Sequence, residues 1–72
     1  MKKIKKIKIR VNGKVMLIKE NTDLLKLADN LKIPLKKVAI ELNKEIMNKK
    51  KMNGKILKKN DTVEIVHFIG GG

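Results

Sequence analysis

Residues 7–19 read IKIRVNGKVMLIK, and this stretch decides the architecture of the chain. Apolar residues alternate with basic ones as far as Asn12-Gly13, and a second alternating run follows. Alternation of period two predicts strands, and Asn and Gly both tolerate the positive φ that a two-residue hairpin turn requires. The stretch therefore predicts a β-hairpin with a fixed register.

That register gives the two faces of the hairpin different characters. Ile9 falls opposite Met16 on the face that should carry the core. The other face receives Val15 and Leu17 beside basic residues. A face that contacts only water does not need apolar residues, so we expect Val15 and Leu17 to contact a partner.

A short helix should follow the hairpin. Leucine and alanine recur at three- and four-residue spacing from Leu24 to Leu31, which is typical of an amphipathic helix. Thr22 or Asn21 is placed to cap its first amides, with Asp23 at the positive end of the dipole. Ile33-Pro34 ends the helix by about Leu31, because a residue before proline avoids helical geometry.

The second half of the chain predicts more strands. Residues 38–42 alternate and lead through a turn at Asn43-Lys44 to a short strand around Ile46. Residues 48–61 are polar and predict a loop. The expected anchors of this loop to the core are Met52, Ile56 and Leu57.

The last strand is TVEIVHFI, residues 62–69, with Val63 and Ile65 toward the helix and Val66 and Phe68 on the opposite face. The order of elements predicts an α+β domain with one main helix on one face of a mixed sheet. The first and last strands should pair at its centre, in the β-grasp arrangement. We expect a flexible lead-in at 1–6, a domain at 7–69 and a flexible glycine tail at 70–72.

Composition limits the function. A chain of 72 residues holds one domain with a thin core, so an enzyme acting alone is not expected. With no cysteine, neither disulfides nor a Cys/His zinc site can support it. No apolar run approaches the roughly 20 residues that cross a bilayer, and we expect a cytosolic protein without membrane binding.

The net charge of +12 raises the question of nucleic-acid binding. Eighteen of the nineteen basic residues are Lys, however, whereas base and phosphate readers favour the bidentate Arg fork. Phe68 is the single aromatic residue, which leaves no platform for stacking bases. We therefore expect no nucleic-acid partner, with a small basic RNA-binding module kept as an alternative.

The candidate for chemistry is the C-terminus. His67 is the single imidazole, without a Cys, a Ser-His-Asp set or a metal-spaced cluster beside it. Gly72, by contrast, presents a carboxylate that no Cβ crowds, and Gly70 and Gly71 allow it to extend into a narrow channel. A carboxylate resists nucleophiles until its oxygen becomes a leaving group, which ATP-dependent adenylation by a partner enzyme would achieve. A frayed end remains the alternative at this point.

Three stretches then point to a known family: IKIRVNGK, VAIELNKEI and, above all, VEIVHFIGGG. With them, residues 7–72 resemble the ThiS family, the sulfur carriers of thiamine biosynthesis, which have a ubiquitin-like β-grasp fold. The resemblance implies that Gly72 is adenylated by a ubiquitin-activating-like adenylyltransferase with MgATP, the chain itself binding no cofactor and no metal. Gly70 and Gly71 would be the threading tail.

The resemblance also implies the remaining steps and partners. Sulfur from a cysteine desulfurase or another donor would convert Gly72 to a thiocarboxylate, which delivers sulfide to thiazole synthase. Val66, Phe68 and Ile69 would meet the partners, on the face that also holds Val15 and Leu17. The turn at Asn43-Lys44 departs from the family pattern, which often has Asn-Gly there. Carriers for molybdopterin or tRNA thiolation, and a protein modifier, are alternatives within the same fold.

Overall fold

The predicted hairpin is formed by β1 (Lys6–Val11) and β2 (Lys14–Lys19). Its register is confirmed: Ile9 lies opposite Met16, and Val15 and Leu17 share the other face. Asn12 and Gly13 have φ of 51° and 81°, the left-handed values that the turn needs. The structure, a computed structural model, describes residues 5–68.

The hairpin ladder begins earlier than the sequence indicated. β1 starts at Lys6, opposite Lys19, and the Glu20 amide donates to the Lys5 carbonyl at 2.8 Å. Lys5 and Lys6, expected to belong to the lead-in, thus take part in the ladder. Residues 1–4 lie outside the described part of the chain.

Helix α1 spans Leu24–Asn30, and Leu31 is its C-cap, so the helix ends where expected. Its cap is Asp23, whose side chain accepts from the Lys26 amide at 2.6 Å. The expected cap, Thr22 or Asn21, was therefore wrong. The Thr22 hydroxyl donates instead to the Lys19 carbonyl at 2.7 Å, which closes the turn after β2 and leaves the capping position to the next residue.

The middle of the chain holds more helix than the sequence suggested. A 3-10 turn, η1 (Leu35–Lys37), precedes β3 (Val38–Leu42), and the expected turn leads to β4 (Glu45–Met47). The expected loop then contains a short helix, α2 (Lys49–Met52), because Asn48 caps it by accepting from the Lys51 amide at 2.8 Å. Met52 and Leu57 are buried anchors as expected, but Ile56 is 43% exposed, so its assignment as an anchor was wrong.

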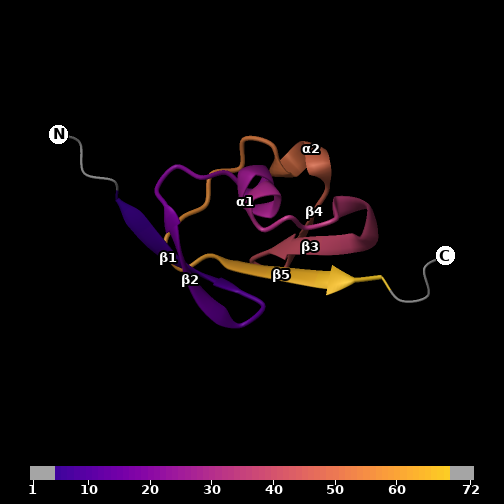
Figure 1. Cartoon of the computed structure of the whole chain (residues 1–72), viewed down its shortest axis with the longest axis horizontal. Coiled ribbons are helices and arrows are strands. Elements are labelled where there is room, and N and C mark those ends of the chain that lie inside the picture. Colours follow the sequence, from indigo (N-terminus) through magenta and orange to yellow (C-terminus); the bar gives the residue numbers. More distant parts are fainter. Residues whose placement is uncertain (1–4, 69–72) are drawn as a thin grey trace.

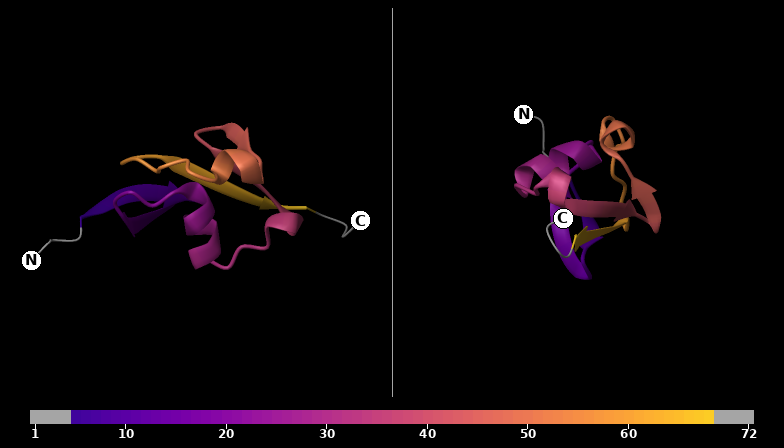
Figure 2. Two further views of the ribbon diagram at one scale, coloured as in Figure 1. Left: turned by 90° about the horizontal axis from the view of Figure 1, so that it is seen from above. Right: turned by 90° about the vertical axis from the view of Figure 1, so that its right-hand side faces the viewer.

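The last strand, β5 (Thr62–His67), completes a five-stranded sheet of order β2-β1-β5-β3-β4. It runs parallel to β1 and antiparallel to β3, which confirms that the first and last strands pair at the centre. Figure 1 shows β5 running past the end of the hairpin. Figure 2 shows α1 and α2 on the same side of the strands, so the other face of the sheet carries no helix.

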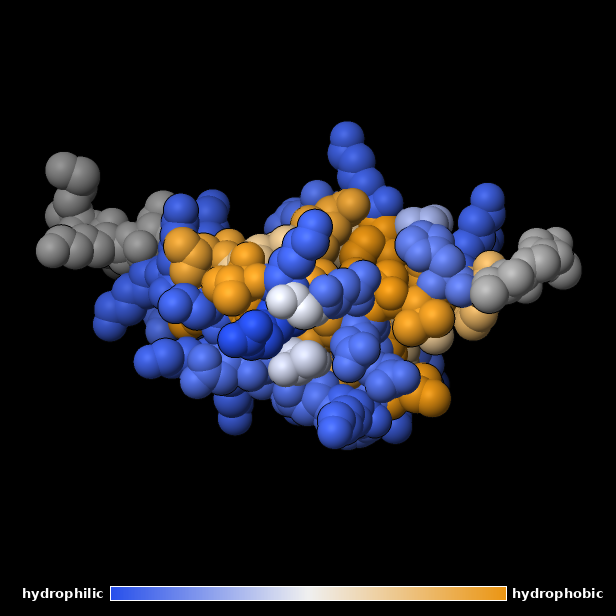
Figure 3. Space-filling view, turned by 90° about the horizontal axis from the view of Figure 1, so that it is seen from below, coloured by the Kyte–Doolittle hydropathy of each residue, from blue (hydrophilic) through white to orange (hydrophobic). Residues whose placement is uncertain are grey.

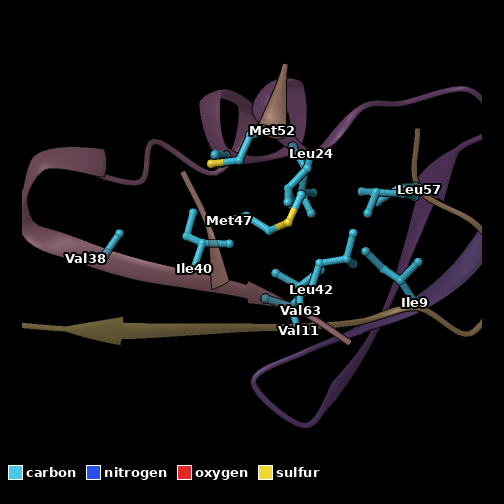
Figure 4. Close-up of a cluster of buried hydrophobic side chains, with 13 residues drawn as sticks. Ile9, Val11, Leu24, Val38, Ile40, Leu42, Met47, Met52, Leu57 and Val63 are labelled. Carbon is cyan, nitrogen blue, oxygen red and sulfur yellow. The ribbon is translucent and has the colours of Figure 1, made fainter. Parts of the chain in front are cut away.

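The core lies between the sheet and the two helices, and Figure 4 shows its side chains converging from all of these elements. Ile9, Leu24, Met52, Leu57 and Val63 are almost completely buried. Packing of these apolar side chains is the main source of stability, since the sequence contains no cysteine for disulfides. None of the helices in residues 5–68 has the length and apolar character to cross a bilayer.

Candidate interaction site at the end of β5

The end of β5 presents apolar side chains to solvent. Val63 is buried beneath the helices, and alternation along the strand turns Glu64 and Val66 to the face without helices. Val66 is 53% exposed, and Phe68, just beyond the strand, is 62% exposed. Exposed apolar residues on a helix-free face are a candidate surface for a protein partner.

Hydrogen bonds from both sides hold this end of β5 in place. The Phe68 amide donates to the Lys37 carbonyl at 2.9 Å, beside β3. On the other side, the Ile65 amide donates to the side-chain oxygen of Asn12 at 2.7 Å. The hairpin turn and the segment before β3 therefore fix the backbone of this end of β5 as far as Phe68.

Ile46 is a further exposed apolar residue on the same face, and the sequence reasoning missed it. Ile46 is 69% exposed and lies opposite Glu41 on β3, which in turn lies opposite Glu64 on β5. The signal was present in the sequence: a two-residue turn at 43–44 places Ile46 opposite Glu41, and hence on the same face as Ala39.

Val15 and Leu17, assigned to the same surface, form a separate patch. Both are more than half exposed and lie on the expected face. They belong to the edge strand β2, however, and Arg10 on β1 lies between Val15 and Thr62 of β5. β2 and β5 are therefore separated by two strand spacings, or about 10 Å. Val66 also lies four residues beyond Thr62 along β5, which adds about 13 Å. Figure 3 shows this side of the molecule, where hydrophilic side chains divide the hydrophobic areas.

Charge is also unevenly distributed over this face. Glu41 and Glu64 lie directly opposite each other on β3 and β5. The hairpin side carries basic residues instead, with Lys6 opposite Lys19. Within residues 5–68 the ion pair present is Lys51 with Glu45, at 3.6 Å and mostly exposed. A partner that covers the end of β5 would therefore meet two carboxylates beside apolar side chains.

The polar side chains of the described residues do not gather into a metal site. Residues 5–68 contain no group of three His, Cys, Asp or Glu side chains that could hold a metal ion. His67 is exposed at the end of β5. The other predicted site residues, Ile69 and Gly70 to Gly72, lie outside the described part of the chain.

Comparison with known proteins adds a family. The model of the ThiS family matches residues 7–72. The sulfur carrier protein ThiS of Bacillus subtilis is 37% identical over 65 residues, which cover 89% of this chain and 98% of that protein. A thiazole synthase of Magnetococcus marinus is 36% identical over 66 residues, or 92% of this chain. This chain spans only 20% of that longer relative.

Solved structures agree with the sequence match. The crystal structure of a thiamine biosynthesis protein (ThiS) from Geobacter metallireducens superimposes with a TM-score of 0.79 at 30% identity, covering 92% of this chain and all of that one. An NMR structure of a thiamine biosynthesis protein from the same organism gives a TM-score of 0.72 at 30% identity, over 92% and 88% of the two chains. The expected α+β fold of the β-grasp type is thus confirmed.

Proposed function

This chain belongs to the ThiS family, the sulfur carriers of thiamine biosynthesis, and on that premise we propose that the carboxyl group of Gly72 carries the sulfur. In this proposal the chain is a small carrier protein of the cytoplasm and a co-substrate of other enzymes. The observation that supports it best is the end of β5, where exposed apolar residues held from both sides lead directly into Ile69 and the three glycines.

The chemistry requires activation of the carboxylate. An oxygen of the Gly72 carboxylate attacks the α-phosphorus of ATP, which the partner adenylyltransferase holds with Mg²⁺, and pyrophosphate leaves. The terminal sulfur of a persulfide on a cysteine desulfurase or another donor then attacks the acyl carbon, and AMP leaves. A thiol next attacks the donor sulfur of the resulting acyl disulfide, so that donor and thiol form a disulfide and the acyl sulfur is released. The product is a thiocarboxylate, whose sulfur thiazole synthase consumes.

The tail suits this role for a steric reason. Glycine has no Cβ, so the acyl carbon of Gly72 stays open to attack and the preceding Gly70 and Gly71 fit a narrow channel. Phe68, which precedes Ile69 and the glycines in the sequence, is hydrogen-bonded to Lys37, so the point from which the tail starts is fixed.

The partners are proposed to dock on the helix-free face. Val66, Phe68 and Ile69 form the main contact, Ile46 adds an apolar side chain on the same face, and Val15 with Leu17 forms a second contact. The Magnetococcus marinus relative, named a thiazole synthase, supports one partner, because a region similar to this chain lies within that longer protein. A carrier fused to the enzyme that consumes its cargo would keep the two at high effective concentration.

Intact mass tests the proposal. The chain is incubated with its cognate adenylyltransferase, MgATP and a sulfur donor, and exchange of one oxygen for sulfur should add about 16 Da. A variant lacking Gly72 is the matched control and should gain nothing while retaining its fold. No mass change in the full chain with any such enzyme would exclude the carrier role.

The next transfer separates this proposal from its alternatives. The thiocarboxylate form should lose its added mass when thiazole synthase turns over. Loss only with a molybdopterin synthase or a tRNA-thiolating enzyme would instead assign the chain to those pathways. Specific RNA binding that weakens steeply with salt, and that deletion of Gly72 leaves intact, would favour the RNA-binding alternative.

A further inference from the structure

The C-terminal half of β5 has an open edge. β1 pairs along the same edge of β5, but only with the first residues of the strand. β1 pairs with β5 only at Arg10 with Thr62 and Val11 with Val63, because the hairpin then turns away. The Asn12 amide donates to the Val63 carbonyl at 2.9 Å, and the Asn12 side chain accepts from the Ile65 amide. β5 continues past that point, as Figure 1 shows.

The register identifies which backbone groups face this edge. In the antiparallel ladder with β3, Val66 pairs with Ala39, and the Phe68 amide donates to the Lys37 carbonyl. The backbone N–H and C=O groups of every second residue of β5 therefore point toward β3. The backbone N–H and C=O groups of Ile65 and His67 therefore point away from β3, toward the open edge. Asn12 takes the Ile65 amide, and among residues 5–68 nothing bonds the Ile65 carbonyl or the amide and carbonyl of His67.

We propose that this open edge, at Ile65 and His67, receives an extended segment of the activating adenylyltransferase as an added β-strand. The inference rests on the proposed function and specifies how the partner engages the carrier. Exposed strand edges are templates for such pairing, in which main-chain hydrogen bonds supply affinity. Pairing here would hold the strand that leads straight into Gly72.

The charge of the chain argues for a different protein as occupant and against a second copy. Two copies would bring together two bodies of net charge +12, which repel each other. The other edges are less suitable: β2 is bounded by Lys14 and Lys19, which discourage pairing, and β4 is only three residues long.

Amide hydrogen exchange tests the pairing on the wild-type chain. In the free protein the His67 amide should exchange quickly, and binding of the adenylyltransferase without ATP should slow it about tenfold or more. The Ile46 amide, which the register places on the far edge of β4, is the internal reference and should change little. A complex in which His67 still exchanges quickly, or in which protection appears at Ile46 instead, would refute the proposal. Protection of His67 by this chain alone at high concentration would assign the edge to a second copy and refute it as well.

A pair of variants isolates the amide. His67→Pro removes an N–H that the described chain does not use, and Val66 before it is already in the extended geometry that proline imposes. His67→Ala removes the side chain and keeps the N–H. We expect the proline variant to bind the adenylyltransferase about tenfold more weakly and the alanine variant to lose less than about threefold, with folding checked by circular dichroism. Equal affinities in two folded variants would contradict strand pairing. If the proline variant does not fold, exchange at His67 in the wild type decides.

The outcome is separable from that of the proposed function. A gain of about 16 Da at Gly72 together with fast exchange at His67 in the complex would retain the carrier and reject the added strand. Absence of the mass gain with every candidate enzyme would remove the function on which the inference rests.

Discussion

Lys44 occupies a backbone position that suits glycine. Its φ is 71°, in the left-handed region, whereas the equivalent position of the first hairpin is Gly13 with φ of 81°. A side chain in that region costs roughly 1–2 kcal/mol, partly offset by the greater freedom of glycine in the unfolded chain. We expect Lys44→Gly to raise the free energy of unfolding by about 0.5–1 kcal/mol in urea titrations. Gly13→Ala is the reciprocal control and should lower it. An unchanged or lower value for Lys44→Gly would show that the turn is not strained.

Asp23 joins α1 to a segment distant in sequence. One carboxylate oxygen accepts from the Lys26 amide at 2.6 Å and the other from the Gly54 amide at 3.1 Å. Removing both acceptors in Asp23→Ala should cost about 1–2 kcal/mol of unfolding free energy, measured by chemical denaturation. Asp23→Asn, with one acceptor oxygen left, should fall between that variant and the wild type. If Asp23→Asn and Asp23→Ala are equally destabilising, the stabilisation comes from the bond to the Gly54 amide and not from the cap on Lys26.

At the scale of elements, the sequence predicted what short-range rules determine. The register of the first hairpin follows from Asn12-Gly13, and the turn before β4 follows from Asn43-Lys44 in the same way. Some local features were also missed, such as the Asp23 cap and the short helix α2, but other features depend on partners far along the chain. The bond from the Ile65 amide to Asn12 joins residues 53 positions apart, and no local pattern records it.

The same limit applied to the candidate site. The face on which Val66 and Leu17 lie followed from alternation, but the distance between them depends on the order and stagger of the strands. Strand order places β1 between them, so one expected surface became two patches. The residue missed, Ile46, was recoverable only by carrying the register of β3 onto β4.

The two patches are expected to differ in importance. Val66→Asp should weaken adenylyltransferase binding about tenfold or more, because it places a charge beside Phe68 and next to Glu64 in a contact that must exclude water. Leu17→Asp should weaken it less, because its β1 partner Lys8 and two strand spacings separate Leu17 from β5. Calorimetric titration of each folded variant gives the comparison. A larger loss for Leu17→Asp would move the main contact to the hairpin.

For the whole molecule, the folded body and the tail should be separable. The core described above is built from side chains within residues 5–68, and Gly70 to Gly72 have no side chains to add to it. Removing residues 70–72 should therefore change the free energy of unfolding by less than about 0.5 kcal/mol, while abolishing the gain of mass. Thermal melts and intact mass on the same preparation test both statements. A clear loss of stability would mean that the glycines pack on the domain.

Net charge is the remaining property of the whole molecule, and it predicts how salt affects folding. A compact body of charge +12 repels itself, and residues 5–68 hold one exposed ion pair to offset this. Raising NaCl from about 0.01 M to about 0.15 M shortens the Debye length from about 30 Å to about 8 Å, so the midpoint of thermal unfolding should rise. Replacing Lys6, Lys8 and Lys19 by Gln removes three charges from one face of the hairpin, where Lys6 lies opposite Lys19, and should flatten the dependence on salt. If added NaCl instead lowers the midpoint, attraction between opposite charges outweighs repulsion, and the excess of lysine does not limit the stability of the fold.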